Sequence, residues 1–243
     1  MIPRFYCPDL AATVGATIAL PDAAAHHAGR VLRLKAGEQV TLFDGVGHEW
    51  EGQLASVGKE VTVEIQSAAA GVAEPILKIT LVQSLPSGDK MDWVVQKAVE
   101  LGVTSIQPVA AKRSVVKLSG ERAVKRITHW QEVAVSACEQ SRRNVVPQVL
   151  PLLDLNQYFA QTRNSEEQRF LLAPTGGERL REMAMPGNSI ALLIGPEGGF
   201  DDSEEAAARS VGFKPLLLGP RILRTETAGL ATIAAMMALW GDI

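Results

Sequence analysis

The sequence predicts an α/β protein that begins with a small antiparallel β-barrel and continues into a mostly parallel sheet with helices on both faces. Three observations lead to this prediction. Short β-type runs fill residues 1–70, an alanine-rich stretch at Ser67–Pro75 breaks their pattern, and strand-like and helix-like segments alternate after it. We therefore expect an N-terminal domain over residues 1–70 and a second domain over residues 74–243.

The N-terminal barrel is predicted from four segments that alternate in polarity or are rich in β-branched residues. They are Val31–Leu34, Gln39–Phe43, Glu49–Leu54 and Glu60–Ile65. Glycine-containing turns separate them, which is typical of short strands in a small barrel. One helical turn is expected at Ala23–Arg30.

The second domain is predicted to alternate strands with helices. The expected strands are Ile76–Gln83, Ser105–Val109, Arg169–Ala173, Ser189–Ile194 and Phe213–Leu218, and the first two expected helices are Lys90–Leu101 and Arg122–Ser141. Asp202-Ser-Glu-Glu205 resembles a capping box that opens a further helix ending at Gly212. The apolar run Ala228–Trp240 would cover about 20 Å as a helix, which is too short for a bilayer, so we expect a core or interface helix.

Composition and cysteine usage favour a cytoplasmic globular protein. Hydrophobic residues make up 47% of the chain and charged residues 21%, which is enough for a core without a long disordered arm. The N-terminus lacks the pattern of a secretory signal. The two cysteines, Cys7 and Cys138, lie far apart without metal-ligand spacing, and the four histidines form no metal constellation. We expect no bound metal.

The charge distribution is uneven although the net charge is only −3. Residues 112–143 contain eight lysines and arginines against three glutamates, whereas residues 178–205 contain seven acids against two arginines. Such asymmetry can direct a polyanion such as RNA to one face of an acidic protein. An ordinary solvated helix face is an alternative explanation of the basic stretch.

Two similar junctions near the C-terminus point to a ligand site. At Leu192–Phe200 and at Leu216–Ala228, an apolar strand meets Gly-Pro and then a segment suited to a helix. Sheets of this class bind ligands where strand ends meet helix starts, although the glycines could simply terminate strands. The chain lacks a P-loop and a Gly-x-Gly-x-x-Gly, and Glu197 would repel phosphate. A neutral or cationic ligand such as S-adenosylmethionine is expected instead.

The two junctions also carry a resemblance to a known family. Ile194-Gly-Pro-Glu-Gly-Gly-Phe200 and Leu218-Gly-Pro-Arg-Ile-Leu-Arg-Thr-Glu-Thr-Ala228 resemble the signature of the bacterial 16S rRNA uridine N3-methyltransferases of the SPOUT superfamily. Weaker likeness appears at Pro3–Phe5, His27–Arg33, Lys97–Gly102 and Trp130–Pro147. The resemblance implies a PUA-like or OB-like RNA-binding domain at the N-terminus and a C-terminal domain with a deep trefoil knot. It further implies a homodimer in which two subunits complete each active site.

The resemblance also implies which residues form the active site. S-adenosylmethionine would be held chiefly by backbone groups of Ala173, Ile194, Gly195, Glu197, Gly198, Leu218, Gly219, Ile222, Leu223 and Thr227. Arg224 is expected to stabilise the uracil anion, because its guanidinium fork matches two acceptors. Glu226 is expected either to take the N3 proton or to act as a helix cap that orients Arg224.

Contacts to RNA are expected mainly from arginines. Arg4, Arg30, Arg33, Arg142 and Arg143 would bind phosphates of 16S rRNA, and His27 would touch RNA, although any one arginine could instead form an ion pair. A related methyltransferase acting on tRNA or on a ribose 2′-hydroxyl is an alternative function. A non-catalytic RNA-binding assembly factor is another.

Overall fold

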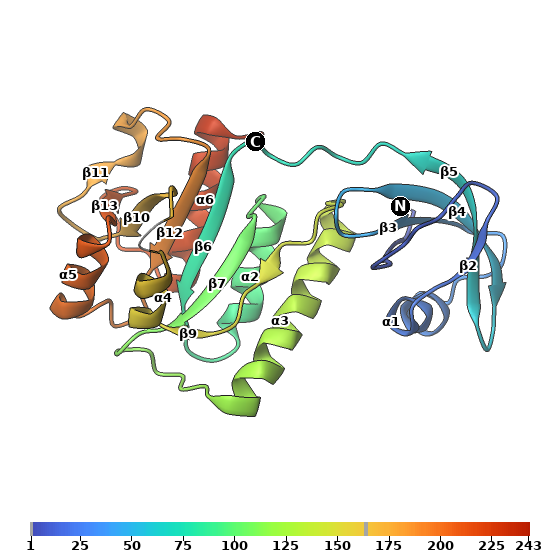
Figure 1. Cartoon of the computed structure of the whole chain (residues 1–243), viewed down its shortest axis with the longest axis horizontal. Helices are drawn as coiled ribbons and strands as arrows, with labels where there is room; N and C mark the ends of the chain where they lie inside the picture. Colours follow the sequence, from blue (N-terminus) through green and yellow to red (C-terminus); the bar gives the residue numbers. More distant parts are fainter. Residues whose placement is uncertain (1, 163–164) are drawn as a thin grey trace. The chain divides into compact units, whose positions relative to one another are not determined.

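The structure, a computed structural model, describes residues 2–162 and 165–243 and divides into two compact units (Figure 1). One unit runs from the N-terminus to Glu74 and includes the segment Cys138–Val146, while Pro75–Ala137 and Pro147–Ile243 form the other. The segment 138–146 lies inside the predicted C-terminal domain but packs with the N-terminal unit. The Tyr6 amide, for example, donates to Glu139 Oε1 at 3.1 Å.

The N-terminal unit contains a five-stranded sheet in the order β1-β3-β4-β5-β2, with only the β1–β3 pair parallel. Its strands are β1 (Arg4–Tyr6), β2 (Thr17–Ala19), β3 (Gln39–Phe43), β4 (Glu49–Val57) and β5 (Val61–Ala69). Alternate side chains, including Phe5, Leu42 and Val63, are fully buried in its core. The sequence therefore identified β3, β4 and β5, but it missed the short strands β1 and β2.

The first predicted strand, Val31–Leu34, is absent, and a helical segment ends at its first residue. α1 (Asp22–His26) continues directly into a π-helix at His27–Val31. The Leu32 amide donates to His27 O at 2.9 Å and the Leu34 amide donates to Ala28 O at 3.0 Å. The prediction of a strand at Val31–Leu34 is therefore wrong, because these local hydrogen bonds satisfy amides that a strand would direct to a neighbour.

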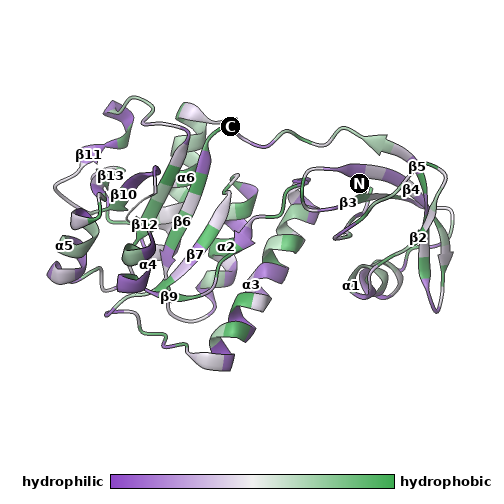
Figure 2. Ribbon diagram, viewed as in Figure 1, coloured by the Kyte–Doolittle hydropathy of each residue, from purple (hydrophilic) through white to green (hydrophobic). Residues whose placement is uncertain are grey.

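The C-terminal unit contains an eight-stranded sheet in which every adjacent pair is parallel, as predicted. The strand order is β11-β13-β10-β12-β6-β7-β8, and β9 also pairs with β7. The strands are β6 (Lys78–Ser84), β7 (Ser105–Ala110), β8 (Gln148–Val149), β9 (Leu153–Asp154), β10 (Gln168–Leu172), β11 (Glu178–Arg179), β12 (Ser189–Ile194) and β13 (Lys214–Leu217). Figure 2 shows hydrophobic residues along β7 and β12, as expected of strands covered on both faces.

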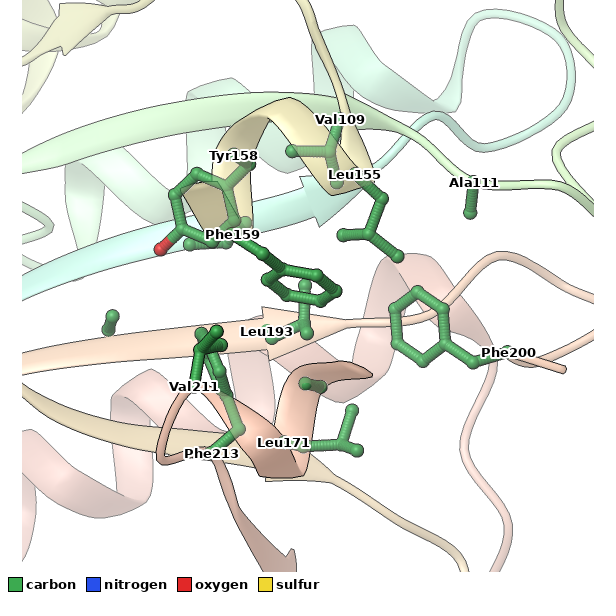
Figure 3. Close-up of a cluster of buried hydrophobic side chains, with 13 residues drawn as sticks. Val109, Ala111, Leu155, Tyr158, Phe159, Leu171, Leu193, Phe200, Val211 and Phe213 are labelled. Carbon is green, nitrogen blue, oxygen red and sulfur yellow. The ribbon is translucent and has the colours of Figure 1, made fainter. Parts of the chain in front are cut away.

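Helices cover both faces of this sheet. They are α2 (Lys90–Glu100), α3 (Gly120–Ser141), α4 (Leu155–Thr162), α5 (Asp202–Ser210) and α6 (Thr225–Trp240), with a short 3₁₀ turn at Leu180–Glu182. α4 and α5 enclose one apolar cluster, in which Phe159 and Phe200 lie beside Leu193 of β12 (Figure 3). α6 packs on α2 and on the opposite face of β6 and β12. This contact is close because a Cβ on Gly229 would lie 3.1 Å from Leu81 Cδ1.

The start of α5 differs by one residue from the predicted capping box. Asp201, rather than Asp202, is the N-cap, and its Oδ1 accepts from the Glu204 amide at 2.8 Å. Glu204 Oε2 in turn accepts from the Asp201 amide at 3.0 Å. Asp201 occupies the capping position because its backbone is extended, whereas Asp202 already belongs to the first turn.

Within the described parts of the chain, no helix combines the length and apolar character needed to cross a membrane.

Candidate functional site

A cavity of about 610 Å³ opens where β10, β12 and β13 end. Three loops that follow these strands line it, and the second and third are the two junctions singled out in the sequence. Nine of the predicted cofactor residues lie in its wall: Ala173, Ile194, Gly195, Glu197, Gly198, Leu218, Gly219, Ile222 and Leu223. Thr227 does not line the cavity and is exposed on α6. The parallel sheet brings the loops together because all of its strands end at one edge.

The glycines of the cavity wall serve different purposes. A Cβ on Gly195 would lie 3.2 Å from the Phe200 ring, and one on Gly198 would lie 3.3 Å from Arg113 Cβ. These two glycines therefore let the loop pack closely against Phe200 and Arg113. A Cβ on Gly219 would have no atom within 4 Å. The same holds for Gly199, but its φ of 67° disfavours other residues, so Gly219 is the wall position where a side chain can be added without backbone strain.

Glu197 fastens the second loop to the segment between β6 and α2. Its Oε1 accepts from the Ser87 amide at 2.9 Å, from Ser87 Oγ at 2.6 Å and from Lys90 Nζ at 3.1 Å. Burial alone would raise the pKa of Glu197, but the bonds from Ser87 and Lys90 outweigh it and lower the pKa to about 2. The carboxylate is therefore ionised and already paired, so its charge is less available to a cationic ligand than the sequence suggested.

Two further contacts hold the same loop. Arg113, in the segment after β7, donates through Nη1 to Gly198 O at 3.0 Å and to Phe200 O at 3.2 Å. Thr225, at the start of α6, donates through Oγ1 to Gly195 O at 2.6 Å. Thr225 Oγ1 in turn accepts from Nε2 of the fully buried Gln83 at 3.0 Å. The loop that we call the cofactor loop, Gly195–Phe200, is thus fixed from three neighbouring elements.

Lys90 and Arg113 also line the cavity, and sequence reasoning did not select either as a site residue. The available signal was their position, because each follows a strand whose C-terminal end lies at the same edge of the sheet as β12. Without the register of β6 and β7, that signal could not be distinguished from an ordinary helix start and an ordinary loop.

The two predicted catalytic residues stand at the start of α6. Arg224 lines the cavity, and its side chain makes no capping hydrogen bond to the helix. Glu226 lies just outside the wall, with Oε1 3.4 Å from Lys90 Nζ. Among the described residues, Glu226 Oε2 is buried without a hydrogen-bond partner. Glu226 was expected either to take a proton or to orient Arg224 as a cap. Among the described residues its ion pair is with Lys90 of α2.

The predicted RNA-binding residues of the N-terminal unit fall into two groups. The side chain of Arg4 is only 7% exposed, with Nη1 2.7 Å from Glu49 Oε2, and Arg143 is buried in an ion pair with Glu74. Both arginines are engaged inside the unit, since a buried charge requires a partner. This corrects the expectation that they reach phosphates.

The other predicted RNA contacts remain accessible. Arg30, Arg33 and Arg142 are exposed. His27 is partly exposed, with its ring edge-on to Phe5 and its Nδ1 3.9 Å from Glu139 Oε2. Arg33 and Arg142 have φ values of 55° and 66°, a left-handed conformation that is uncommon for residues other than glycine. Of the five arginines predicted to bind RNA, Arg30, Arg33 and Arg142 are therefore the exposed ones.

Comparison with known proteins agrees with this arrangement. Residues 73–237 match the family model of the RNA methyltransferase domain, and residues 20–66 match that of the RNA methyltransferase PUA domain. The chain is 32% identical over 230 residues to the ribosomal RNA small subunit methyltransferase E of Bacillus subtilis, covering 90% of this chain and 89% of that protein.

Two solved structures superpose over nearly the whole chain. The ribosomal RNA small subunit methyltransferase E of Neisseria gonorrhoeae, bound to S-adenosyl methionine, is 45% identical with a TM-score of 0.94, covering 100% of this chain and 99% of that chain. A putative methyltransferase of Legionella pneumophila, in complex with the same cofactor, is 37% identical with a TM-score of 0.94, covering 100% of both chains.

The pairing of Glu197 predicts a pH-dependent contribution to stability. Because its pKa lies near 2 in the folded protein instead of the ordinary 4.5, its contribution is fully present above about pH 4.5 and is lost as the pH falls toward 2. Glu197→Gln should cost about 1 kcal/mol near neutral pH and progressively less below pH 4.5. Urea unfolding from pH 7 to pH 3 measures this difference. Glu182→Gln, at an exposed glutamate, is the control, and a Glu197→Gln cost independent of pH would contradict the prediction.

Proposed function

The chain belongs to the RNA methyltransferase family of the ribosomal RNA small subunit methyltransferase E proteins, and from this premise we propose that it methylates N3 of a uridine in the 16S rRNA of the small subunit, with S-adenosylmethionine as methyl donor. The observation that carries the proposal is the cavity lined by the three loops that follow β10, β12 and β13. Two relatives that match this chain over its whole length were solved with S-adenosyl methionine bound. A ribosomal RNA substrate implies a cytoplasmic protein.

The residues present fit this cofactor. The cavity of about 610 Å³ is of the size usual for small-molecule sites, and most of its lining residues come from the three loops. Gly219 keeps the wall open, and the residues that would hold the cofactor are Ala173, Ile194, Gly195, Gly198, Leu218, Ile222 and Leu223. Glu197 would contribute by fixing the cofactor loop. Bound S-adenosylmethionine supplies an electrophilic methyl group on sulfur.

The substrate-side chemistry falls to Arg224 and Glu226. Uridine N3 must lose its proton before or during its attack on a methyl group, so a proton acceptor and a cation near O2 or O4 would both lower the barrier. Arg224 lines the cavity and offers a permanent cation. Glu226 Oε2 is a buried acceptor without a donor among the described residues, and a buried acceptor of this kind favours binding a proton donor. We assign the anion-stabilising role to Arg224 and the proton-accepting role to Glu226.

The knot expected of the superfamily is part of this proposal. β13 lies beyond β10 in the sheet, yet the chain returns through residues 218–224 to α6, which packs on β6 and β12. This return and the first residues of the segment 173–188, which joins β10 to β12, line the same cavity. A segment that crosses neighbouring strands beside such a loop supports threading and a trefoil knot in residues 74–243.

The N-terminal unit is proposed as the RNA-binding domain. Its sheet ends at β1 and β2, and the register shifts in the β4–β5 pair are irregularities of the kind that bend a sheet toward closure as a barrel. Arg30, Arg33 and Arg142 supply exposed positive charge for phosphates. Residues 1–70 would thus bind rRNA while residues 74–243 carry out methyl transfer.

We also propose a homodimer that uses α6. This helix leaves Ala238 and Leu239 exposed, and Trp93 on the adjacent α2 is 53% exposed. Exposed apolar side chains on packed helices are typical of an interface between subunits. Light scattering of the purified protein should return twice the 26.0 kDa of one chain, and Leu239→Asp should shift it toward one chain. A wild-type mass of a single chain would refute the dimer.

Cofactor binding should depend on the open side of Gly219. Gly219→Val places a branched side chain in the cavity, so calorimetry should show S-adenosylmethionine affinity reduced by about 10-fold or more. Gly58→Val is the matched control, because Gly58 also has no atom within 4 Å of its added Cβ but lies between β4 and β5. No detectable heat with the wild-type protein would favour the RNA-binding assembly factor instead.

Loss of the protein should remove one N3-methyluridine from small-subunit rRNA. Mass spectrometry of digested rRNA from a deletion strain measures this directly, and complementation with Arg224→Ala should leave methylation about 100-fold slower than wild type. Complementation with Arg181→Ala, at an exposed arginine away from the cavity, should restore it. An unaltered rRNA profile combined with a missing tRNA or 2′-O-methyl modification would assign the related enzyme activity.

A further inference from the structure

Lys90 connects the cofactor side of the cavity to the substrate side. It is the first residue of α2 and lies outside both C-terminal junctions. Its Nζ is 3.1 Å from Glu197 Oε1 and 3.4 Å from Glu226 Oε1. Glu197 belongs to the cofactor loop, and Glu226 belongs to the first turn of α6. One ammonium group therefore contacts the two carboxylates that bracket the proposed active site.

The contacts of Lys90 fix the position of its ammonium group more firmly than a single surface ion pair would. An ammonium group has three donor hydrogens, so Lys90 can bind both carboxylates at once. The side chains of Lys90 and Glu197 are each 31% exposed and that of Glu226 is 17% exposed. Solvent and salt therefore screen the attraction between these charges less than they would in a fully exposed ion pair. Ser87 supports the same Glu197 oxygen through its amide and its hydroxyl. The whole β6–α2 segment thus acts on the cofactor loop.

Lys90 does not have the properties of a proton acceptor. The hydrogen bond to Glu197 raises the pKa of Lys90, and Glu226 adds to this effect while desolvation opposes it. The group therefore stays a cation at neutral pH. Lys90 pairs with Oε1 of Glu226. The buried Oε2 has no hydrogen-bond partner among the described residues and could therefore accept from a donor.

We propose that Lys90 is a positioning residue that fixes the cofactor loop through Glu197 and orients the Glu226 carboxylate toward the uridine. This inference rests on the proposed function, since it names a further residue for the same reaction. It has two separable consequences. Loss of the Glu197 contact loosens the cofactor loop and weakens cofactor binding, whereas loss of the Glu226 contact slows methyl transfer even when the cofactor is saturating.

Lys97 provides a matched control on the same helix. Its Nζ is 2.7 Å from Glu100 Oε1, and the two side chains are 30% and 27% exposed. Lys97 is absent from the cavity wall. Lys97→Met therefore removes an ion pair of similar exposure from α2 without touching the site.

The test compares Lys90→Met, Lys90→Arg and Lys97→Met for S-adenosylmethionine affinity by calorimetry and for single-turnover methylation of small-subunit rRNA at saturating cofactor. We expect Lys90→Met to lose about 10-fold in affinity and a further 10-fold or more in rate, with Lys90→Arg recovering most of both. Lys97→Met should match the wild type. Combining Lys90→Met with Glu226→Gln should slow the rate no further than Glu226→Gln alone.

The outcomes separate this inference from the proposed function. A wild-type protein that neither binds the cofactor nor methylates rRNA would overturn the proposed function. An active wild type in which Lys90→Met and Lys97→Met behave alike would overturn only the role of Lys90. Lys90→Gln serves as a second neutral variant should Lys90→Met unfold, and thermal unfolding followed by circular dichroism identifies that case.

Discussion

The anchoring of the cofactor loop is the interaction on which the rest of the site depends. Glu197 ties this loop to Ser87 and Lys90, Arg113 ties it to the segment after β7, and Thr225 ties it to α6. Glycine-rich loops are conformationally free, so a binding wall made of their backbone requires such external contacts. The three contacts come from elements that are distant in sequence and adjacent only because of the parallel sheet.

The same arrangement determines what kind of chemistry the site can perform. Transfer of a methyl group to a weakly acidic nitrogen needs in-line positioning and stabilisation of the uracil anion more than it needs a covalent intermediate. In the proposed mechanism the three loops position the methyl donor, and Arg224 and Glu226 at the start of α6 supply charge to the uridine. Lys90 Nζ contacts both Glu197 and Glu226, so in this proposal one side chain supports both cofactor binding and the substrate side.

The N-terminal unit shows why a basic residue cannot be assigned to RNA from its type alone. Arg4 stacks on Phe43 with its guanidinium carbon 5.0 Å from the ring centroid and pairs with Glu49, so it stabilises the unit from within. Arg143 likewise pairs with Glu74 inside the unit. Arg33 and Arg142, in contrast, are exposed and hold left-handed backbones, which cost energy that a glycine would avoid.

The sequence by itself determined the parallel α/β unit, the C-terminal junctions and most of the cavity wall, because apolar periodicity and Gly-Pro turns are local signals. Gly219, Leu223 and Arg224, which the sequence selected, line the cavity. The tertiary structure alone decided the partners of each charge, including the pairing of Glu197 and Glu226 with Lys90 and the burial of Arg4. The Lys90 pairings join residues more than a hundred positions apart, and Arg4 pairs with Glu49, 45 positions away. No local pattern encodes which distant side chain will satisfy a charge.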